Sequence, residues 1–306
     1  SQVRALTIHP GLAARSSLQY TARKYLIVIK RKALLIMTHY LVAAAFALIV
    51  PLSTHASECP PDSVAVGPTC VDKYEASVWR IAPTQEKLIR RVQRGRASVV
   101  DLTNGEATRH GLTADDYDAA NCPDTGNGCT LVYAVSIPGV APSRFLTWFQ
   151  AAAACRNAGK RLLTNAEWQA AAFGTPDPGV GGNGIATCNT GAANVLPSGS
   201  AASCVSDVGA FDMVGNLWEW VADWTQGDTN PFAPQTGGTT NATYGNDLMS
   251  GTNPARTQGD GLTFPAAIER GGSFGYGNGT AAGVFALSAA QAPSALFSDL
   301  GFRCGQ

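Results

Sequence analysis

Eight cysteines, all of them after residue 56, are the feature that most limits how this 306-residue chain can fold. An even number of cysteines in an exported chain is typical of a disulfide framework. Short spacings favour three local bridges, Cys59–Cys70, Cys122–Cys129 and Cys188–Cys204, which leave Cys155 to pair with Cys304. In the loop-closure model the long bridge contributes about 4–5 kcal/mol to stability, against about 3 kcal/mol for a short one. We therefore expect a disulfide-stapled domain whose last strand is tied to a helix.

The residues before Cys59 have the pattern of an export signal. Met37 is followed by the apolar run Leu41–Leu52 and then by Thr54-His55-Ala56, with small residues placed as a signal peptidase prefers. We expect a signal peptide at 37–56 and upstream or leader sequence at 1–36. An uncleaved membrane anchor and an Arg-rich organelle transit peptide are the alternatives. Export would make the protein secreted, periplasmic or bound at the cell surface.

Charge and histidine content exclude several classes of function. Residues 1–56 hold seven Lys or Arg and no acidic residue, so the rest of the chain has 15 basic against 22 acidic residues, a net charge of −7. Such a balance gives no basic footprint for nucleic acid. After residue 56 the chain has one histidine, His110, and no Cys-x-x-Cys pair. A histidine-based triad or dyad, a zinc site and a thioredoxin-type redox site are therefore not indicated.

Local patterns predict a domain of the α+β class with little regular secondary structure. Val64–Val66 and Cys70–Val78 are rich in strand-forming residues and predict an opening hairpin. Residues 80–135 mix charge runs with Gly and Asp, and we expect them to form an insertion with one short helix at Glu86–Arg94. From Gly174 to Val208 the chain is rich in Gly, Asn, Ser and Pro, and regular structure there should be sparse.

Two helices have clear start signals. The pairs Thr147 with Gln150 and Thr164 with Glu167 have the spacing of capping boxes, in which the Thr hydroxyl accepts from a backbone amide three residues on. Gly159 and Gly174 mark the ends of the two helices. We expect the helices to pack together across the short link between them, with their tryptophans in the core.

Four motifs in this order resemble the formylglycine-generating enzyme, or sulfatase-modifying factor, family. They are TWFQAAAACRNAGKRLLTNAEWQAAAFGT (147–175), DMVGNLWEWVADW (212–224), RGGS (270–273) and GFRC (301–304). The resemblance spans roughly Cys59 to the C-terminus and implies the C-type lectin-like fold, with a staple between the first helix and the last strand. The pairing of Cys155 with Cys304 agrees with it. We expect 57–306 to be a single domain of this type.

The resemblance also identifies what the chain lacks. Enzymes of that family bind copper through two cysteines a few residues beyond Gly-Gly-Ser. The matching positions here are about Tyr276 and Ala281, and no cysteine lies between Cys204 and Cys304. Without thiolates there is neither a soft metal site nor a nucleophile. We therefore expect no copper and no enzyme activity; an oxidase-like enzyme with altered chemistry is an alternative.

The stretch between RGGS and GFRC looks like the variable region of diversity-generating retroelement proteins, a non-catalytic branch with this fold. In that system AAY codons of a template repeat become NNY codons, which never encode Lys, Glu, Gln, Met or Trp. Between Phe274 and Asp299 the chain has one of these residues, Gln291. The resemblance implies an exported display protein whose variable region, 270–304, binds a protein or glycan ligand. The reverse transcriptase would act on the gene and not on the protein.

In this interpretation a fixed frame surrounds variable surface positions. The frame consists of Gly271, Gly272, Gly301, Phe302, Arg303 and a strand at Val284–Leu287. The ligand-facing positions that we expect to vary are Gly275, Tyr276, Asn278, Ala281, Ser288, Ala290, Ala295, Phe297 and Asp299. Tyr276 and Phe297 would be the anchors, because exposed aromatic side chains carry much of the binding energy of interfaces. The alternatives are that Phe297 is a core residue, and that the domain is a fixed carbohydrate- or protein-binding module.

A structural Ca²⁺ ion is the one cofactor that we consider. The carboxylates of Asp212 and Glu219 and the carbonyl oxygens of Gly215 and Leu217 are hard ligands that suit Ca²⁺. Family members place a structural calcium in a matching turn. The alternative is a tight turn in which Asp212 is a cap and Glu219 pairs with an arginine.

Overall fold

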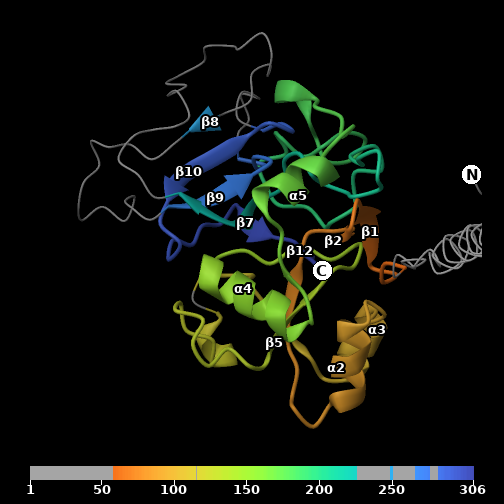
Figure 1. The fold of residues 1–306 in the computed structure, drawn as a ribbon, viewed down its shortest axis with the longest axis vertical. Coiled ribbons are helices and arrows are strands. Elements are labelled where there is room, and N and C mark those ends of the chain that lie inside the picture. Colours follow the sequence, from red (N-terminus) through yellow and green to blue (C-terminus); the bar gives the residue numbers. More distant parts are fainter. Residues whose placement is uncertain (1–57, 115, 226–248, 251–265, 276–281) are drawn as a thin grey trace, which may run out of the picture. The chain divides into compact units, whose positions relative to one another are not determined.

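Three small β-sheets and four short α-helices form the regular structure of residues 58–114, 116–225, 249–250, 266–275 and 282–306, the part of the chain that the computed structural model describes (Figure 1). These residues belong to one compact unit, Ala56–Gln306. The signal peptide predicted at 37–56 and the leader predicted at 1–36 lie outside the described residues. Within the described ranges, no helix is long and apolar enough to span a bilayer.

The helices are α2 (Glu86–Gln93), α3 (Val99–Asn104), α4 (Trp148–Asn157) and α5 (Asn165–Ala171). The strands of the first sheet, in spatial order, are β1 (Ser63–Val66), β2 (Thr69–Asp72), β12 (Cys304–Gly305) and β6 (Arg161–Leu162). The second sheet has the order β11 (Leu300–Phe302), β7 (Trp218–Thr225), β9 (Ala266–Arg270), β10 (Leu287–Gln291) and β8 (Met249–Ser250). The third has β4 (Thr108–His110), β3 (Ser77–Arg80) and β5 (Val132–Val135).

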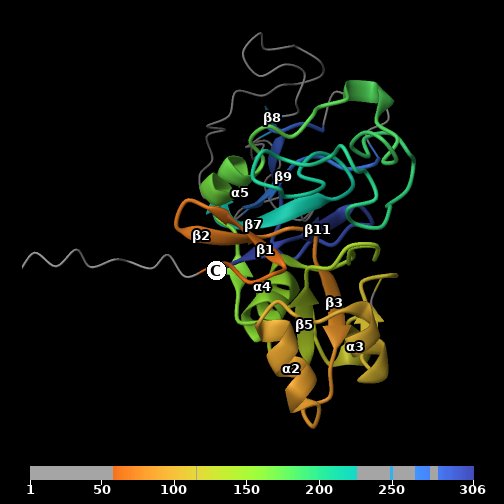
Figure 2. The same cartoon turned by 90° about the vertical axis from the view of Figure 1, so that its right-hand side faces the viewer.

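Two large hydrophobic clusters, and a smaller one around Cys188 and Cys204, form the core of the domain (Figures 1 and 2). The larger cluster joins α2, α3 and α4 to the β4–β3–β5 sheet, with fully buried side chains such as Val78, Leu102 and Leu146. The second cluster joins α5 to the β7–β9–β10 region, around Trp168 and Ile268. In both views α2 and α3 lie at one end and β8 and β9 at the other.

The opening hairpin is confirmed, but the second predicted strand is two strands. β1 pairs with β2 in antiparallel register, Val64 opposite Val71. The predicted strand Cys70–Val78 breaks after Asp72 and resumes at Ser77 in a different sheet. The amide of Ala76 donates to the carbonyl of Phe302 at 2.9 Å, so the chain crosses from one sheet to the other at this point.

Both capping boxes are confirmed. The Thr147 hydroxyl accepts from the Gln150 amide, the Thr164 hydroxyl accepts from the Glu167 amide, and each Gln or Glu side chain bonds back to the cap residue. The expectation that the two helices pack together is wrong, because α4 packs against β5 in the larger cluster whereas α5 packs against β7 and β9 in the second. A strand, β6, fills the link between them.

The four predicted disulfides are confirmed: Cys59–Cys70, Cys122–Cys129, Cys155–Cys304 and Cys188–Cys204. The stretch 80–135 contains the predicted helix, α2, and also α3, which the sequence analysis missed. The long Cys155–Cys304 bridge ties α4 to β12, the last strand of the domain.

Candidate functional site

The C-terminal segment, residues 270–304, has its first border at Arg270, the last residue of β9. Its guanidinium lies 4.6 Å from the centroid of the Trp168 ring. It donates to Asn165 Oδ1 at 3.1 Å and to the carbonyl of Val284 at 3.0 Å. Because Asn165 and Trp168 belong to α5, Arg270 ties the turn before β10 to that helix.

The two glycines after Arg270 are required by the backbone. Gly271 and Gly272 have φ values of +88° and +80°, which side-chain-bearing residues rarely adopt. A Cβ on Gly271 would also lie 2.9 Å from the carbonyl oxygen of Met213 and 3.0 Å from the Trp168 ring. The Ser273 hydroxyl then donates to Asp299 Oδ2 at 2.8 Å, which joins the start of the segment to its end.

Arg303 fixes the second border. It is buried, and its Nη2 donates to Glu219 Oε1 at 2.6 Å and to the carbonyl of Phe211 at 2.8 Å. Burial alone would lower the pKa of Arg303, but the adjacent Glu219 carboxylate raises it above its usual value. At Gly301, a Cβ would lie 2.7 Å from a Leu217 methyl carbon and 2.8 Å from the carbonyl of Ser143. Both borders are therefore held by side-chain hydrogen bonds and by close backbone approaches at glycines.

Between the borders, Ser294–Ser298 form a surface strip beside the start of α4. The amide of Phe145 donates to the carbonyl of Phe297 at 3.0 Å, and Arg144 Nη1 donates to the carbonyl of Ser298 at 2.9 Å. The amide of Trp148 donates to the carbonyl of Pro293 at 2.9 Å, just before the strip. These bonds end on main-chain oxygens, so they do not depend on which side chains the strip carries.

The side chains of the strip largely face solvent. Ser294, Phe297 and Ser298 are exposed, and Ala295 and Leu296 are half-buried. Phe297 is 39% exposed, which excludes the alternative that it is a core residue. Gly275, at the other end of the segment, is exposed as well.

The predicted ligand-facing positions therefore fall into three groups. Gly275 and Phe297 are exposed as expected, and Ala295 and Asp299 are half-buried, the latter bonded to Ser273. Tyr276, Asn278 and Ala281 lie outside the described residues. For Ala290 only the backbone is described. Ser288 is the exception.

Ser288 does not face solvent, and the prediction for it is wrong. It is 6% exposed and lies opposite Glu269 in the β9–β10 pairing, on the inner side of the sheet. The predicted strand Val284–Leu287 is wrong in its bounds for a related reason. Arg270 and Gly283 hold a turn there, with the amide of Ala286 donating to the carbonyl of Gly283 at 3.0 Å, so β10 begins only at Leu287.

The sequence analysis missed Arg144 and Phe145, which support the strip. Phe145 has a φ of +57°, a left-handed conformation that is uncommon for any residue other than Gly, Asn or Asp. The guanidinium of Arg144 lies 5.1 Å from the centroid of the Phe145 ring. Nothing in the stretch Ser143-Arg144-Phe145 signals a left-handed residue, so only the structure reveals this contact.

The four residues predicted to bind calcium lie in a buried acidic cluster. Asp212 Oδ2 accepts from the amide of Gly199 at 2.6 Å. Glu219 accepts from Arg303 and from Trp168 Nε1, the latter at 2.7 Å. The amide of Gly215 donates to the carbonyl of Gly271, and the amide of Leu217 donates to Glu75 Oε1 at 3.0 Å. Glu219 thus has a guanidinium partner where the prediction gave it Ca²⁺, and calcium binding here stays a prediction.

Burial controls the protonation of this cluster. The pKa of Asp212 is raised to about 6, first by burial and also by the nearby Glu219, although the Gly199 amide bond and Arg303 lower it. Burial likewise raises the pKa of Glu75 well above its usual value. Burial therefore favours the protonated forms of Asp212 and Glu75.

His110 makes a local contact with the backbone. His110 is buried in β4, and its Nδ1 lies 2.8 Å from the carbonyl of Asp116. Across the described ranges, no group of three His, Cys, Asp or Glu residues is placed to hold a metal ion. The geometry of this part of the chain is that of a rigid frame around an exposed strip.

A comparison with models of protein families identifies the family of this chain. The model of the sulfatase-modifying factor enzyme 1-like domain matches residues 84–306, which contain all four motifs. The chain belongs to this family. Its fold is the C-type lectin-like fold of the formylglycine-generating enzyme type, of the α+β class. A comparison with curated protein sequences finds no match.

Two solved structures are similar to this chain. The Major Tropism Determinant U1 variant is 20% identical, with a TM-score of 0.40; the match covers 80% of this chain and 52% of that one. The Treponema denticola variable protein 1 is 20% identical, with a TM-score of 0.35, over 55% of this chain and 71% of that one. This chain thus spans about half the length of the first of them. Likenesses of this size carry no argument about function, which has to be argued from the chain's own residues.

Proposed function

We propose that this protein is an exported ligand-binding protein that presents variable side chains on a fixed frame, and that a retroelement diversifies its C-terminal region. The observation that carries the proposal is the way the surface strip is held. Hydrogen bonds from Phe145 and Arg144 reach its main-chain oxygens, while the side chains of Ser294, Phe297 and Ser298 are exposed. Substitutions in the strip can therefore change the surface without changing the backbone.

The composition of the segment supports the same conclusion. Between Phe274 and Asp299, Gln291 is the one residue that NNY codons cannot encode. Gln291 lies at the end of β10, opposite Ala267 of β9, and not in the strip. A residue in the paired part of the sheet belongs to the fixed frame and needs no variable codon.

The chemistry of the cysteines supports a binding role over catalysis. All eight cysteines form disulfides, and the positions that match the copper-binding cysteines of the family are about Tyr276 and Ala281. A disulfide sulfur is neither a thiolate ligand nor a nucleophile. Four disulfides also favour an oxidising compartment, as expected for a secreted, periplasmic or cell-surface protein.

The ligand would be a protein or a glycan that contacts the strip and Gly275. Phe297 is the described side chain best suited to anchor it, because an exposed aromatic ring buries a large apolar area at little cost in side-chain entropy. The neighbouring Arg144 and Phe145, both half-buried, would form the fixed part of the same surface.

Sequencing of the gene and its surroundings tests this proposal. We expect a near-copy of the stretch that encodes Arg270–Cys304, differing at template adenines, beside a reverse-transcriptase gene. Among copies from the source population, codons 294, 295, 297 and 298 should vary while those of Arg270 and Arg303 stay constant. Uniform 3′ ends and no near-copy would overturn the retroelement proposal and leave a fixed binding module.

A further inference from the structure

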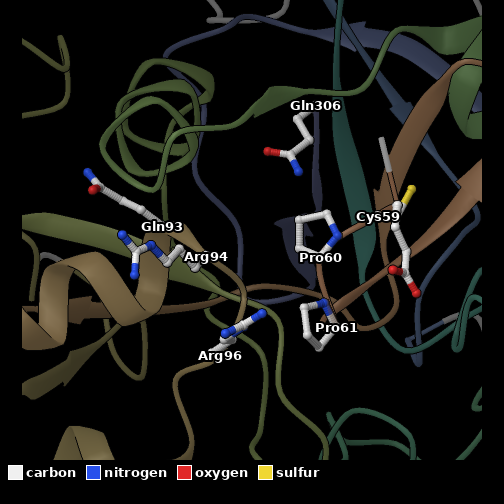
Figure 3. A pocket seen from close by; sticks show the side chains of 8 residues that line it. Cys59, Pro60, Pro61, Gln93, Arg94, Arg96 and Gln306 are labelled. Atoms are coloured by element: carbon white, nitrogen blue, oxygen red, sulfur yellow. The ribbon is translucent and has the colours of Figure 1, made fainter. Parts of the chain in front are cut away.

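A cavity of about 800 Å³ lies beside the C-terminal end of α2, between that helix end and the chain just before β1. Gln93, Arg94 and Arg96, from the end of α2, line one side of it. Pro60 and Pro61 line the other side, and Gln306 extends toward the space between them (Figure 3). None of these residues takes part in the frame or the surface strip.

The backbone that carries the two arginines is rigid. The amide of Gly95 donates to the carbonyl of Val92 at 2.9 Å, and the amide of Arg96 donates to the carbonyl of Arg91 at 2.9 Å. These two bonds form a Schellman motif at the end of α2, with Gly95 in the left-handed conformation at φ +63°. Arg94 and Arg96 therefore flank a fixed turn rather than a loop.

Gly95 also locks this turn against the wall with the prolines. A Cβ on Gly95 would lie 2.0 Å from Asp62 Oδ1 and 2.8 Å from the Cβ of Pro60. The turn after α2 and the segment Pro60–Asp62 therefore approach each other closely beside the cavity.

Positive charge is concentrated at this end of an otherwise acidic domain. Five of the 15 basic residues after residue 56 lie between Lys87 and Arg96. Arg90 pairs with Glu86 and Arg91 with Asp101, both within 2.9 Å. Within the described ranges, Arg94 and Arg96 form no ion pair, although both line the cavity. Their charges are available to a ligand.

We propose that this cavity binds an acidic saccharide, a sugar unit that carries sulfate or carboxylate groups. Guanidinium groups bind such oxyanions through paired, planar hydrogen bonds. The side-chain amides of Gln93 and Gln306 provide acceptors and donors suited to sugar hydroxyls. The volume is in the range of small-molecule pockets and exceeds what an isolated ion needs. Glu58 also lines the cavity, so Arg94 and Arg96 leave the lining with a net charge of +1.

Calorimetric titration with a sulfated, uronic-acid-containing disaccharide tests the site. The full chain should bind it with a dissociation constant below about 1 mM in dilute buffer. The double variant R94Q/R96Q keeps side chains of similar polarity and should bind at least about tenfold more weakly. The matched control R90Q removes an arginine of α2 that does not line the cavity, and its affinity should stay within about twofold. Thermal melts of the three proteins show whether each is folded.

Three results would overturn this proposal. Equal binding of the unsulfated, uncharged disaccharide would show that the arginines do not select an acidic ligand. An affinity of R94Q/R96Q equal to that of R90Q would show that the cavity is not the site. Binding to vesicles with anionic lipids, without binding to the disaccharide, would assign the basic end of α2 to a membrane surface. Variation at the surface strip affects none of these measurements, so the site and the proposed function fail or stand separately.

Discussion

Arg303 and Phe297 lie six residues apart in the sequence, and the fold holds them in opposite ways. Arg303 is 1% exposed, and its guanidinium bonds to Glu219 and to three carbonyl oxygens. Phe297 is 39% exposed, and the bond that positions it ends on its own carbonyl oxygen. A frame fixed by side chains therefore adjoins a strip fixed by its backbone, and only the second arrangement allows residues to change freely.

The long disulfide should show the largest effect within the frame. We expect the double variant C155S/C304S to lose about 5 kcal/mol of unfolding free energy, because the bridge closes a separation of 149 residues. The matched control C122S/C129S opens a separation of 7 residues and should lose about 2 kcal/mol. Denaturation in guanidinium chloride, with the other disulfides intact, measures both. Equal losses of unfolding free energy in the two variants would show that Cys155–Cys304 contributes no more to stability than the short bridge.

Replacement of the buried arginine should come next. R303M leaves Glu219 buried without its guanidinium partner, which costs about 3–5 kcal/mol. R144M removes an arginine that bonds to the surface strip through one exposed contact and should cost no more than about 1 kcal/mol. The two unfolding free energies, measured side by side, compare the frame with the strip. A similar loss in both variants would contradict the distinction between them.

One aspartate placed at two sites of the C-terminal segment sharpens the comparison. S288D places a carboxyl group on the inner side of the sheet opposite Glu269 and should destabilise by about 3 kcal/mol. F297D places the same group on the strip and should change stability by about 0.5 kcal/mol or less. Thermal melts of the two variants decide the matter. If the S288D protein were as stable as the F297D protein, the buried position of Ser288 would be contradicted.

The buried acidic cluster should make the frame sensitive to pH. Since the folded pKa of Asp212 is about 6, above its usual value of 3.8, the folded protein holds a proton that the unfolded chain has lost. The resulting stability is fully present below pH 3.8 and is lost as the pH rises through about 6, a change on the order of 2–3 kcal/mol. In D212N this part of the pH dependence should disappear. An unchanged profile from pH 4 to pH 7 would show that Asp212 is not the group responsible.

Chelation should have the smallest effect. Because Arg303 already neutralises Glu219, we expect EDTA to change the melting temperature by less than about 1 °C. Addition of Ca²⁺ to the chelated protein provides the reciprocal control. A melting temperature that rises by several degrees with Ca²⁺ would instead support the calcium site predicted around Asp212 and Glu219.

The sequence predicts those parts of the fold that depend on local chemistry. The capping boxes at Thr147 and Thr164 and the opening hairpin are set by neighbouring residues, and the disulfides follow from short spacings and elimination. The buried position of Ser288 is set instead by the pairing of β10 with β9, which are separated by 16 residues and a turn. The separation of α4 and α5 into two clusters likewise depends on which sheet each one covers.

The candidate site follows the same division. Phe297 could be predicted as exposed from its position between two motifs, and the structure confirms this. Arg144 and Phe145 could not be predicted, because their contacts with Phe297 and Ser298 join residues about 150 positions apart and require a left-handed φ at an aromatic residue. Long-range contacts through the backbone leave no pattern in the residue types.

Saturation mutagenesis across residues 270–304, with selection for folded protein on the surface of a display host, tests the central claim most directly. We expect positions 294, 297 and 298 to accept most residue types, and positions 270, 271, 301 and 303 to accept almost none. The half-buried positions 295 and 299 should fall between these groups. Equal intolerance along the whole segment, or free substitution at Arg270 and Arg303, would contradict the account of a fixed frame around a variable strip.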